Sequence, residues 1–347
     1  MDQPIIRDPQ TFAQADYVVM ESTYGDRNHT EVWSYTDELA QIIDETLGRG
    51  GNVIIPSFAV GRTQELLYFI REIKDQNLVK SVQDFPVYVD SPLAKRATTI
   101  FCGDLQGYLD DDARKLVGDG THMFSFPGLH LTESTDESKA LNLDKTPKVI
   151  ISASGMCDAG RIRHHLKHNL WRPESSVVFV GFQSPGTLGR HLLEGAESVK
   201  MFGEKIAVKA KLVNFQGLSS HADHDHLIRW AKALKPEETK HIFVVHGDAE
   251  VVPLFVRDLQ NLGYSAHGPL YTEEYDLIAN TQIKAGYIPE KPVKTTAGGA
   301  RSSALYQRLL SAGDSLMSLI RRSKDRDNKT LESFIAAINK LKDKYNF

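Results

Sequence analysis

Cysteine is scarce in this sequence. The 347 residues contain two cysteines, Cys102 and Cys157, which lie far apart and form no C-x-x-C pair. A disulfide scaffold or a zinc ribbon needs more cysteines at closer spacing, so both of these classes of small domain are excluded. Two isolated thiols are typical of a reducing compartment, and we expect both to be buried as small apolar side chains.

Long hydrophobic runs and a large charge of one sign are also absent. No stretch approaches the roughly 18 consecutive apolar residues of a membrane span, and the opening residues MDQPIIRDPQ contain no secretion-signal pattern. We therefore expect a cytoplasmic protein without membrane contact. The formal net charge is -4, so any contact with nucleic acid would depend on local basic patches.

Short β-branched runs alternate with amphipathic helical patterns along most of the chain. Strand followed repeatedly by helix predicts an α/β fold with largely parallel strands. Residues 199–215 differ, because they predict consecutive short strands in an antiparallel portion, and residues 291–347 predict an appended helical tail. The expected helices cover Glu31–Leu47, Arg62–Ile73, Leu93–Phe101, Arg161–Leu170, Leu188–Leu193 and Val251–Leu262.

Each predicted strand ends in a polar or glycine-rich turn, which is where open α/β sheets bind ligands. The turn SASGMCDAGR contains Ser154 and Gly155, and the turn GFQSPGTLGR ends with Arg190 at the start of a helix. Backbone N–H groups and guanidinium groups in such turns bind phosphate. Ser154, Gly155 and Arg190 are therefore phosphate or RNA candidates, although residues of these types can equally serve only to shape the turns.

The stretch LVNFQGLSSHADHDHLIRW nearly matches the metal-binding pattern H-x-H-x-D-H of two-metal hydrolases. His221, Asp225 and His226 match this pattern, whereas Asp223 stands where the second histidine belongs. The full pattern occurs nowhere in the 347 residues. The stretch can thus be an altered metal site or another part of a related enzyme.

Eight motifs follow one another in a fixed order along the chain. They are ADYVVMESTYGDR, IIPSFAVGRTQELL, VYVDSPLA, DESKALN, VIISASGMCDAGRIRHHLKHNL, VVFVGFQSPGTLGR, GLSSHADHDHLIRWA and FVVHGDAE. Together they closely resemble the β-CASP branch of the metallo-β-lactamase superfamily, which contains RNA-processing nucleases such as the cleavage-and-polyadenylation endonuclease. The resemblance extends from about Gln3 to Tyr287.

The resemblance implies roles for individual residues. Glu21 matches motif A and His221 matches motif B, which together deliver a proton to the departing sugar oxygen. His246 matches motif C and would be a metal ligand. Ser219 and Ser220 are expected to contact phosphate. His224 and His226 are then expected on the first turn of a solvent-facing helix rather than at a metal.

The resemblance also implies a domain organisation. We expect a partial metallo-β-lactamase αββα fold from residues 1–52 and 206–290, an inserted parallel-sheet β-CASP domain at 53–205, and the helical tail at 291–347. The family's metal motifs 1 to 4 are missing from the sequence. The chain therefore resembles the C-terminal portion of such an enzyme, produced by natural truncation, by a split gene or by an internally started reading frame.

Zinc is the metal that the resemblance implies, with two ions in a complete family enzyme. Each zinc needs about three or four protein ligands, and only His246 carries over. We therefore expect that this chain alone does not hold two zinc ions stoichiometrically.

Two functions remain open at this stage. The first is a zinc-dependent ribonuclease that acts on single-stranded RNA together with a separate N-terminal half or a homologous subunit. The second is a non-catalytic remnant that binds RNA or a partner. Endonucleolytic and exonucleolytic cleavage are not distinguished by these residues.

Overall fold

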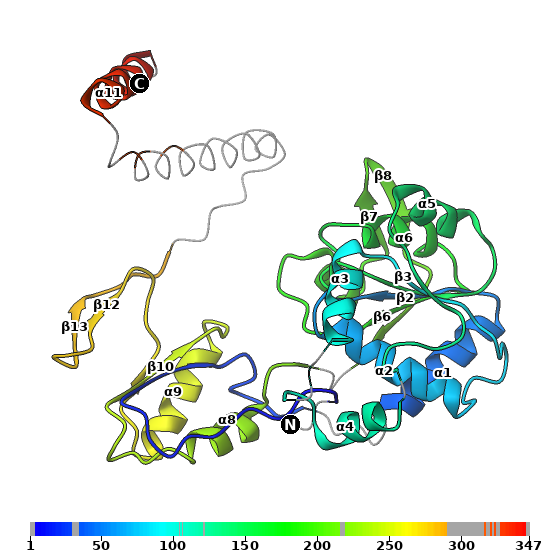
Figure 1. Ribbon diagram of the computed structural model, residues 1–347, viewed down its shortest axis with the longest axis horizontal. Helices are drawn as coiled ribbons and strands as arrows, with labels where there is room; N and C mark the ends of the chain where they lie inside the picture. Colours follow the sequence, from blue (N-terminus) through cyan, green and yellow to red (C-terminus); the bar gives the residue numbers. More distant parts are fainter. Residues whose placement is uncertain are drawn as a thin grey trace. The chain divides into compact units, whose positions relative to one another are not determined.

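The computed structural model describes residues 4–29, 35–103, 105, 107–120, 122–215, 219–289 and 327–344, together with 316, 320 and 323 (Figure 1). The chain divides into two compact units, Met1–Gly286 and Tyr287–Phe347. None of the described helices has both the length and the apolar composition that crossing a membrane requires.

The larger sheet of the first unit has six strands in the order β4-β3-β5-β2-β6-β9, and all of its pairs are parallel. Its central strands are buried on both faces, which suits β-branched sequences such as VIIP in β2 and VIIS in β5. The strands are β2 (Val53–Pro56), β3 (Val87–Val89), β4 (Leu129–Leu131), β5 (Val149–Ser152), β6 (Ser176–Phe179) and β9 (Lys211–Asn214).

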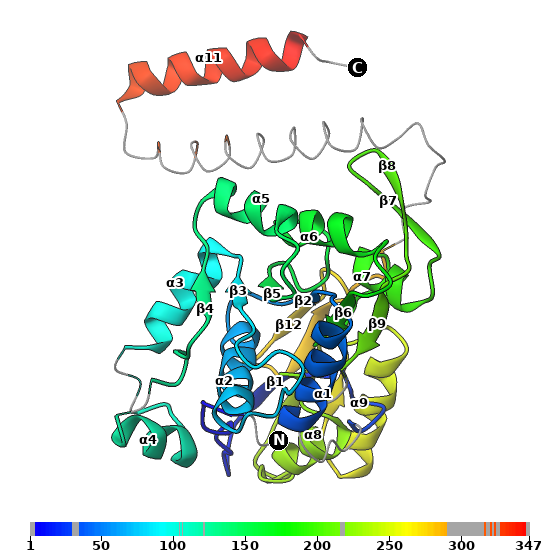
Figure 2. The same ribbon diagram turned by 90° about the vertical axis from the view of Figure 1, so that its right-hand side faces the viewer.

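Helices cover both faces of this sheet (Figures 1 and 2). Alternate residues of β2 separate the two cores: Val53 and Ile55 pack with α1 to α4, and Ile54 packs with α5 to α7. The helices are α1 (Tyr35–Gly48), α2 (Arg62–Asp75), α3 (Pro92–Phe101), α4 (Asp111–Gly118), α5 (Thr135–Leu143), α6 (Ile162–Asn169) and α7 (Leu188–Leu193).

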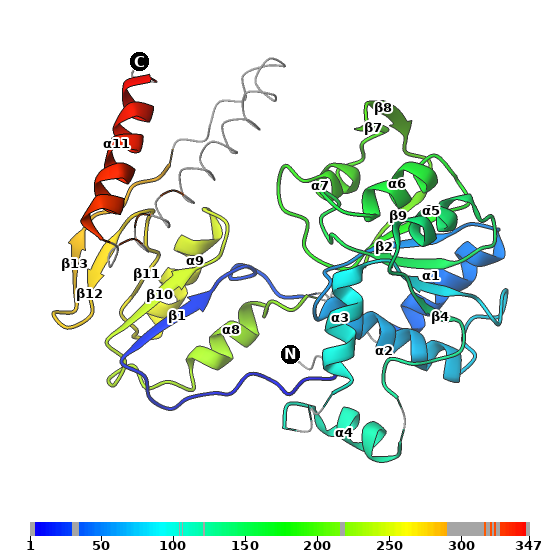
Figure 3. The same ribbon diagram turned by 45° about the horizontal axis from the view of Figure 1, so that its top comes forward.

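A smaller parallel sheet has the order β1-β10-β11, with α8 and α9 beside it (Figure 3). A third hydrophobic core lies between this sheet and its helices. It contains Val18, Met20, Ile242 and Val244 together with apolar residues of α8 and α9. The bounds are β1 (Tyr17–Glu21), α8 (His224–Ala231), β10 (His241–Val245), α9 (Val251–Asn261) and β11 (Ala266–His267).

Two antiparallel hairpins complete the first unit. The strands β7 (Ser198–Met201) and β8 (Glu204–Ala207) form one, and β12 (Glu274–Asp276) and β13 (Thr281–Lys284) form the other. In the second unit, the described residues include the helix α11 (Asn328–Lys344), and most of the predicted tail lies outside the described residues.

The structure confirms the α/β prediction and corrects several details. The antiparallel prediction for residues 199–215 is right for β7 and β8 but wrong for β9, which pairs in parallel with β6. The helices α4 and α5 were not predicted. Cys157 is buried as expected, whereas Cys102 is exposed at the end of α3, and both thiols are free.

The predicted domain boundaries at residues 52/53, 205/206 and 290/291 stay predictions. Two elements outside 53–205 nevertheless belong to the six-stranded sheet by contact. The strand β9 extends the sheet itself, and α1 packs on it through Leu39 and Ile43.

A buried carboxylate joins three of the sequence motifs. Asp90, which follows β3, accepts hydrogen bonds from the hydroxyl groups of Thr132 and Ser138 and contacts Nε2 of His165 at 2.6 Å. Arg161 forms an ion pair with Asp90 at 2.7 Å. Burial alone would raise the pKa of Asp90, but these hydrogen bonds outweigh burial and hold the pKa well below its ordinary value. These contacts therefore hold three of the sequence motifs together at the carboxyl end of β3, which is a structural role.

We predict that Asp90→Ala lowers the free energy of unfolding by about 3–5 kcal/mol, because Arg161 loses its partner for a charge that is held partly away from water. Urea denaturation measures this change. The control is Asp136→Ala, whose carboxylate is 92% exposed and also pairs with a basic residue, and it should change the free energy of unfolding by less than about 0.5 kcal/mol. Equal effects of the two substitutions would contradict the prediction.

Candidate functional site

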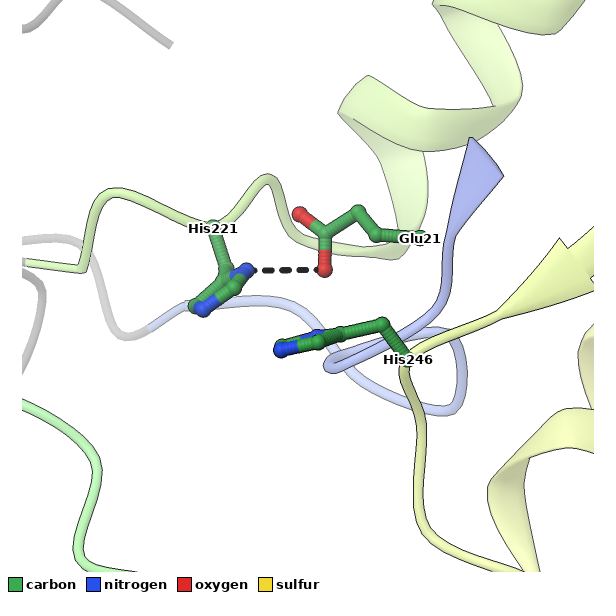
Figure 4. Close-up of side chains that lie close together, drawn as sticks. All are labelled: Glu21, His221 and His246. Carbon is green, nitrogen blue, oxygen red and sulfur yellow. Dashed lines mark hydrogen bonds and ion pairs between the residues drawn. The ribbon is translucent and has the colours of Figure 1, made fainter. Parts of the chain in front are cut away.

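The ends of β1 and β10 and the residues that precede α8 bring the candidate residues together. Glu21 is the last residue of β1, His246 directly follows β10, and His221 precedes α8. Oε2 of Glu21 lies 2.9 Å from Nδ1 of His221, and the two imidazole rings stack with centroids 5.0 Å apart (Figure 4). The structure thus places in one cluster the three residues that motifs A, B and C single out.

The carboxylate of Glu21 is fixed by several donors. Oε1 accepts a hydrogen bond from the backbone N–H of Ala222, and Oε2 accepts one from the backbone N–H of Thr23. Burial alone would raise the pKa of Glu21, but the hydrogen bonds with His221 and Thr23 outweigh burial and lower it to about 2. Glu21 is therefore a carboxylate at neutral pH.

Thr23 links the two imidazoles and was missed in the sequence. Its Oγ1 lies 3.2 Å from Nδ1 of His221 and 3.0 Å from Nδ1 of His246. It also donates to the carbonyl of His246 at 3.1 Å. The only sequence signal was its position in ESTYGD, two residues after Glu21. Thr23 orients both rings and leaves their outer nitrogens on one side (Figure 4).

The turn that carries His246 has special backbone requirements. His246 adopts a φ of 51°, in the left-handed region that few residues other than glycine enter. A Cβ atom added to the next residue, Gly247, would lie 2.3 Å from Oγ and 2.9 Å from the carbonyl oxygen of Ser22. The glycine therefore allows the β10 turn to lie directly against the β1 turn.

The near-match to H-x-H-x-D-H has a structural explanation. Asp223 is the N-cap of α8 and accepts from the backbone N–H of His226 at 3.0 Å. His224 is the first residue of α8 and contacts Asp225 and Asp258. The prediction that His224 and His226 lie on the first helical turn is confirmed, and neither belongs to the Glu21 cluster.

A cavity of about 550 Å³ opens beside the cluster. Ser219, Ser220 and Gly155 line it together with His221 and His246. Ser219 is buried and its Oγ accepts from the backbone N–H of His221 at 3.2 Å. Of the five phosphate or RNA candidates, three therefore lie at the cavity beside the cluster.

The other two candidates lie elsewhere. Arg190 lines an adjoining cavity of about 520 Å³ and pairs with Glu194 at 2.7 Å. Ser154 lines neither cavity; its carbonyl accepts a hydrogen bond from the N–H of Cys157 within the turn. The roles of all five in phosphate or RNA binding stay predictions.

Arg62 connects the two sheets at this cavity. It begins α2, is 5% exposed, and forms a buried ion pair with Glu65. Its Nη2 donates to Oγ of Ser220 at 3.2 Å. The sequence indicated Arg62 only as a basic residue at a helix start, whereas the structure shows that it also positions the turn that precedes His221.

Two family models match this chain. The β-CASP domain matches residues 63–192, and the zinc-dependent metallo-hydrolase RNA specificity domain matches residues 205–269. The chain belongs to the β-CASP family of the metallo-β-lactamase superfamily. His221 and His246 of the candidate cluster both lie within the match to the RNA specificity domain, whereas Glu21 precedes both matched ranges.

Relatives with curated names agree with this family. The chain is 36% identical to a ribonuclease of Thermus thermophilus over 72% of its own length and 55% of that protein. It is 34% identical to an RNase J-like protein of Methanocaldococcus jannaschii over 68% of its length and 52% of that protein. It is 30% identical to a transcription termination factor of Methanosarcina mazei over 68% of its length and 38% of that protein. The chain thus spans about half the length, or less, of the curated relatives it matches.

We predict that Glu21→Gln lowers the free energy of unfolding by about 1–3 kcal/mol at pH 6, because the charged hydrogen bonds of Glu21 are lost. The lowered pKa means that this stabilisation is present above the unfolded value near 4.5 and is lost as pH falls toward about 2. Urea denaturation at pH 6 and pH 3 should therefore show a smaller difference between variant and wild type at pH 3.

Glu38→Gln is the control, because Glu38 lies on the exposed side of α1. It should change the free energy of unfolding by less than about 0.5 kcal/mol at either pH. A Glu21→Gln difference that grows on acidification would show that the carboxylate is not stabilised in the folded state.

Proposed function

We propose that this chain is the RNA-contacting part of a zinc-dependent ribonuclease that hydrolyses phosphodiester bonds in single-stranded RNA. The observation that carries the proposal is the hydrogen-bonded pair of Glu21 and His221 beside His246, with both histidines lining a cavity. The names of the Thermus and Methanocaldococcus relatives agree with this reaction.

Glu21 and His221 are proposed as the catalytic proton-delivery pair. Glu21 contacts Nδ1 of His221, so Nε2 is left on the opposite side of the ring. A carboxylate in this position fixes the tautomer and stabilises a protonated imidazole. His221 can then give a proton from Nε2 to the sugar oxygen that leaves when the phosphodiester bond breaks.

His246 is proposed as a zinc ligand. A histidine that binds zinc usually has its second ring nitrogen held by a hydrogen-bonding partner, and Nδ1 of His246 has Thr23 in this position. Bound zinc ions would supply hydroxide near neutral pH. We assign phosphate contacts to Ser219, Ser220, Gly155 and Ser154, and a contact further along the RNA to Arg190.

The ligand set for two zinc ions does not fit the described residues. Within that part of the chain, Glu21, His221 and His246 are the only group whose ligand atoms lie close enough to share a metal, within 4.8 Å of one another. The oxygens of Glu21 already accept hydrogen bonds, and Nδ1 of His221 faces Glu21. The remaining ligands would come from a separate N-terminal half or a homologous subunit.

The same shortage of ligands favours a second candidate function. A chain that never gains these ligands would be a non-catalytic RNA-binding protein of the family. For either function we propose the cytoplasm as the location, because both cysteines are free.

We predict that the purified chain contains fewer than two zinc ions, because the described residues contain one group of possible ligands, and in it Glu21 and Nδ1 of His221 already contact each other. Metal analysis after dialysis against a zinc-free buffer measures the content, and RNA cleavage by the same sample should be absent. Two tightly held zinc ions per chain would contradict both the ligand assignment and the expected inactivity.

We predict that the chain binds a ten-nucleotide single-stranded RNA with an affinity that falls as salt rises, with a slope of about 0.7 in log affinity against log salt per contacted phosphate. Arg190→Gln should reduce this slope by about 0.7, since one phosphate contact is removed. Fluorescence anisotropy across a salt series measures both values.

Arg114→Gln is the matched control. Arg114 is exposed to a similar degree as Arg190 and pairs with an acidic residue of its own helix, but it lies on α4 and lines neither cavity. Its slope should equal that of the wild type. Absence of RNA binding at low salt would overturn the proposed function.

A further inference from the structure

We propose that Phe58 is a stacking platform for one base of single-stranded RNA. The inference rests on the proposed function and names the part of the RNA that the apolar side of the cavity recognises. Phe58 lies in the turn between β2 and α2, and its side chain is 51% exposed although it lines the cavity.

The cavity beside the Glu21 cluster has two chemically different walls. One wall is polar and comes from the turns after β1 and β10 and from the residues before α8; its polar residues are Thr23, Ser219, Ser220, His221, His246 and Asp248. The other wall comes from turns of the six-stranded sheet and is mixed. Its apolar residues are Pro56, Phe58, Val60, Met156, Val180 and Phe182, and its polar residues are Ser57, Arg62, Gln183 and Ser184.

A nucleotide has the same division into a charged phosphate and a flat, weakly polar base. The volume of about 550 Å³ lies within the range of small-molecule sites. With a phosphate at Ser220 and His221, Phe58 and its apolar neighbours on the opposite wall are the flat, apolar surface that remains for the attached base. Aromatic side chains bind bases of single strands by stacking, largely independently of sequence.

The position of Phe58 is fixed by its surroundings. Its carbonyl accepts hydrogen bonds from the hydroxyl groups of Thr63 at 2.7 Å and Ser57 at 3.1 Å. A Cβ atom added to Gly155 would lie 3.2 Å from Cδ2 and Cε2 of the Phe58 ring. Gly155 therefore lets the ring lie close to the backbone, so that an aromatic ring is held in place before any base arrives.

Arg62 fixes the distance between the two walls. It follows Phe58 in the same turn and donates to Ser220 on the opposite wall. Because the guanidinium is buried and also paired with Glu65, the side chain of Arg62 that joins the two walls is held in one position. The geometry therefore suits a base and its phosphate bound at once.

The test compares two probes on the purified chain by fluorescence anisotropy. One is a labelled ten-nucleotide oligoadenylate, and the other is an abasic ribose-phosphate oligomer of the same length. Phe58→Leu keeps an apolar side chain but removes the flat ring. It should weaken oligoadenylate binding by about five- to 150-fold, the range for loss of one stacked base, and leave binding of the abasic oligomer unchanged.

Phe58→Trp should retain oligoadenylate affinity, because the larger ring also stacks. Trp171→Leu is the matched control: Trp171 is 53% exposed but lies between α6 and β6, away from the carboxyl ends of the strands. It should bind both probes like the wild type. The urea midpoint of each variant should stay at the wild-type value, because neither side chain belongs to a buried core.

The outcomes separate this inference from the proposed function. If the wild type binds oligoadenylate and Phe58→Leu binds it equally well, the stacking role is wrong and the proposed function stands. If Phe58→Leu weakens both probes equally, Phe58 supports the shape of the cavity rather than a base. If the wild type binds neither probe, both the inference and the proposed function fail.

Discussion

The carboxylate of Glu21 is the group on which the geometry of the candidate site depends. It accepts hydrogen bonds from the turn after β1 and from the start of α8, and it contacts the imidazole of His221. A charged acceptor with several donors is more rigid than a neutral one, since each bond is strengthened by the charge. Thr23 then holds His246 in place through contacts with its Nδ1 and its carbonyl oxygen. Residues from three distant parts of the sequence thereby form one surface.

Much of the fold was accessible from the sequence, because alternation of buried strands and amphipathic helices is a local pattern. The positions of Glu21, His221 and His246 were also accessible, through motifs that end predicted strands. Their hydrogen bonds were not, because they join residues about 200 positions apart. The parallel pairing of β9 with β6 was missed for the same reason: strand direction is decided by tertiary contacts rather than by the residues of the strand.

Some motif residues have structural roles that sequence patterns do not separate from chemical ones. Arg161 ends the turn SASGMCDAGR, which suits phosphate, yet it pairs with the buried Asp90. Gly155 also suits a phosphate-binding turn, and the structure gives it a second role beside the ring of Phe58. A glycine or an arginine in a motif indicates that a position is constrained. The partner that imposes the constraint is visible only in three dimensions.

At His246 the turn depends on a left-handed backbone conformation, whereas the proposed chemistry depends on the imidazole. Asparagine enters the same region of backbone conformation at little cost, so a single substitution there could preserve the turn and remove only the imidazole. Gly247 would still allow the close approach to Ser22. A descendant of this protein can therefore lose the proposed zinc ligand by neutral drift while its fold remains the same. A shared fold in this family thus does not show which members are still active.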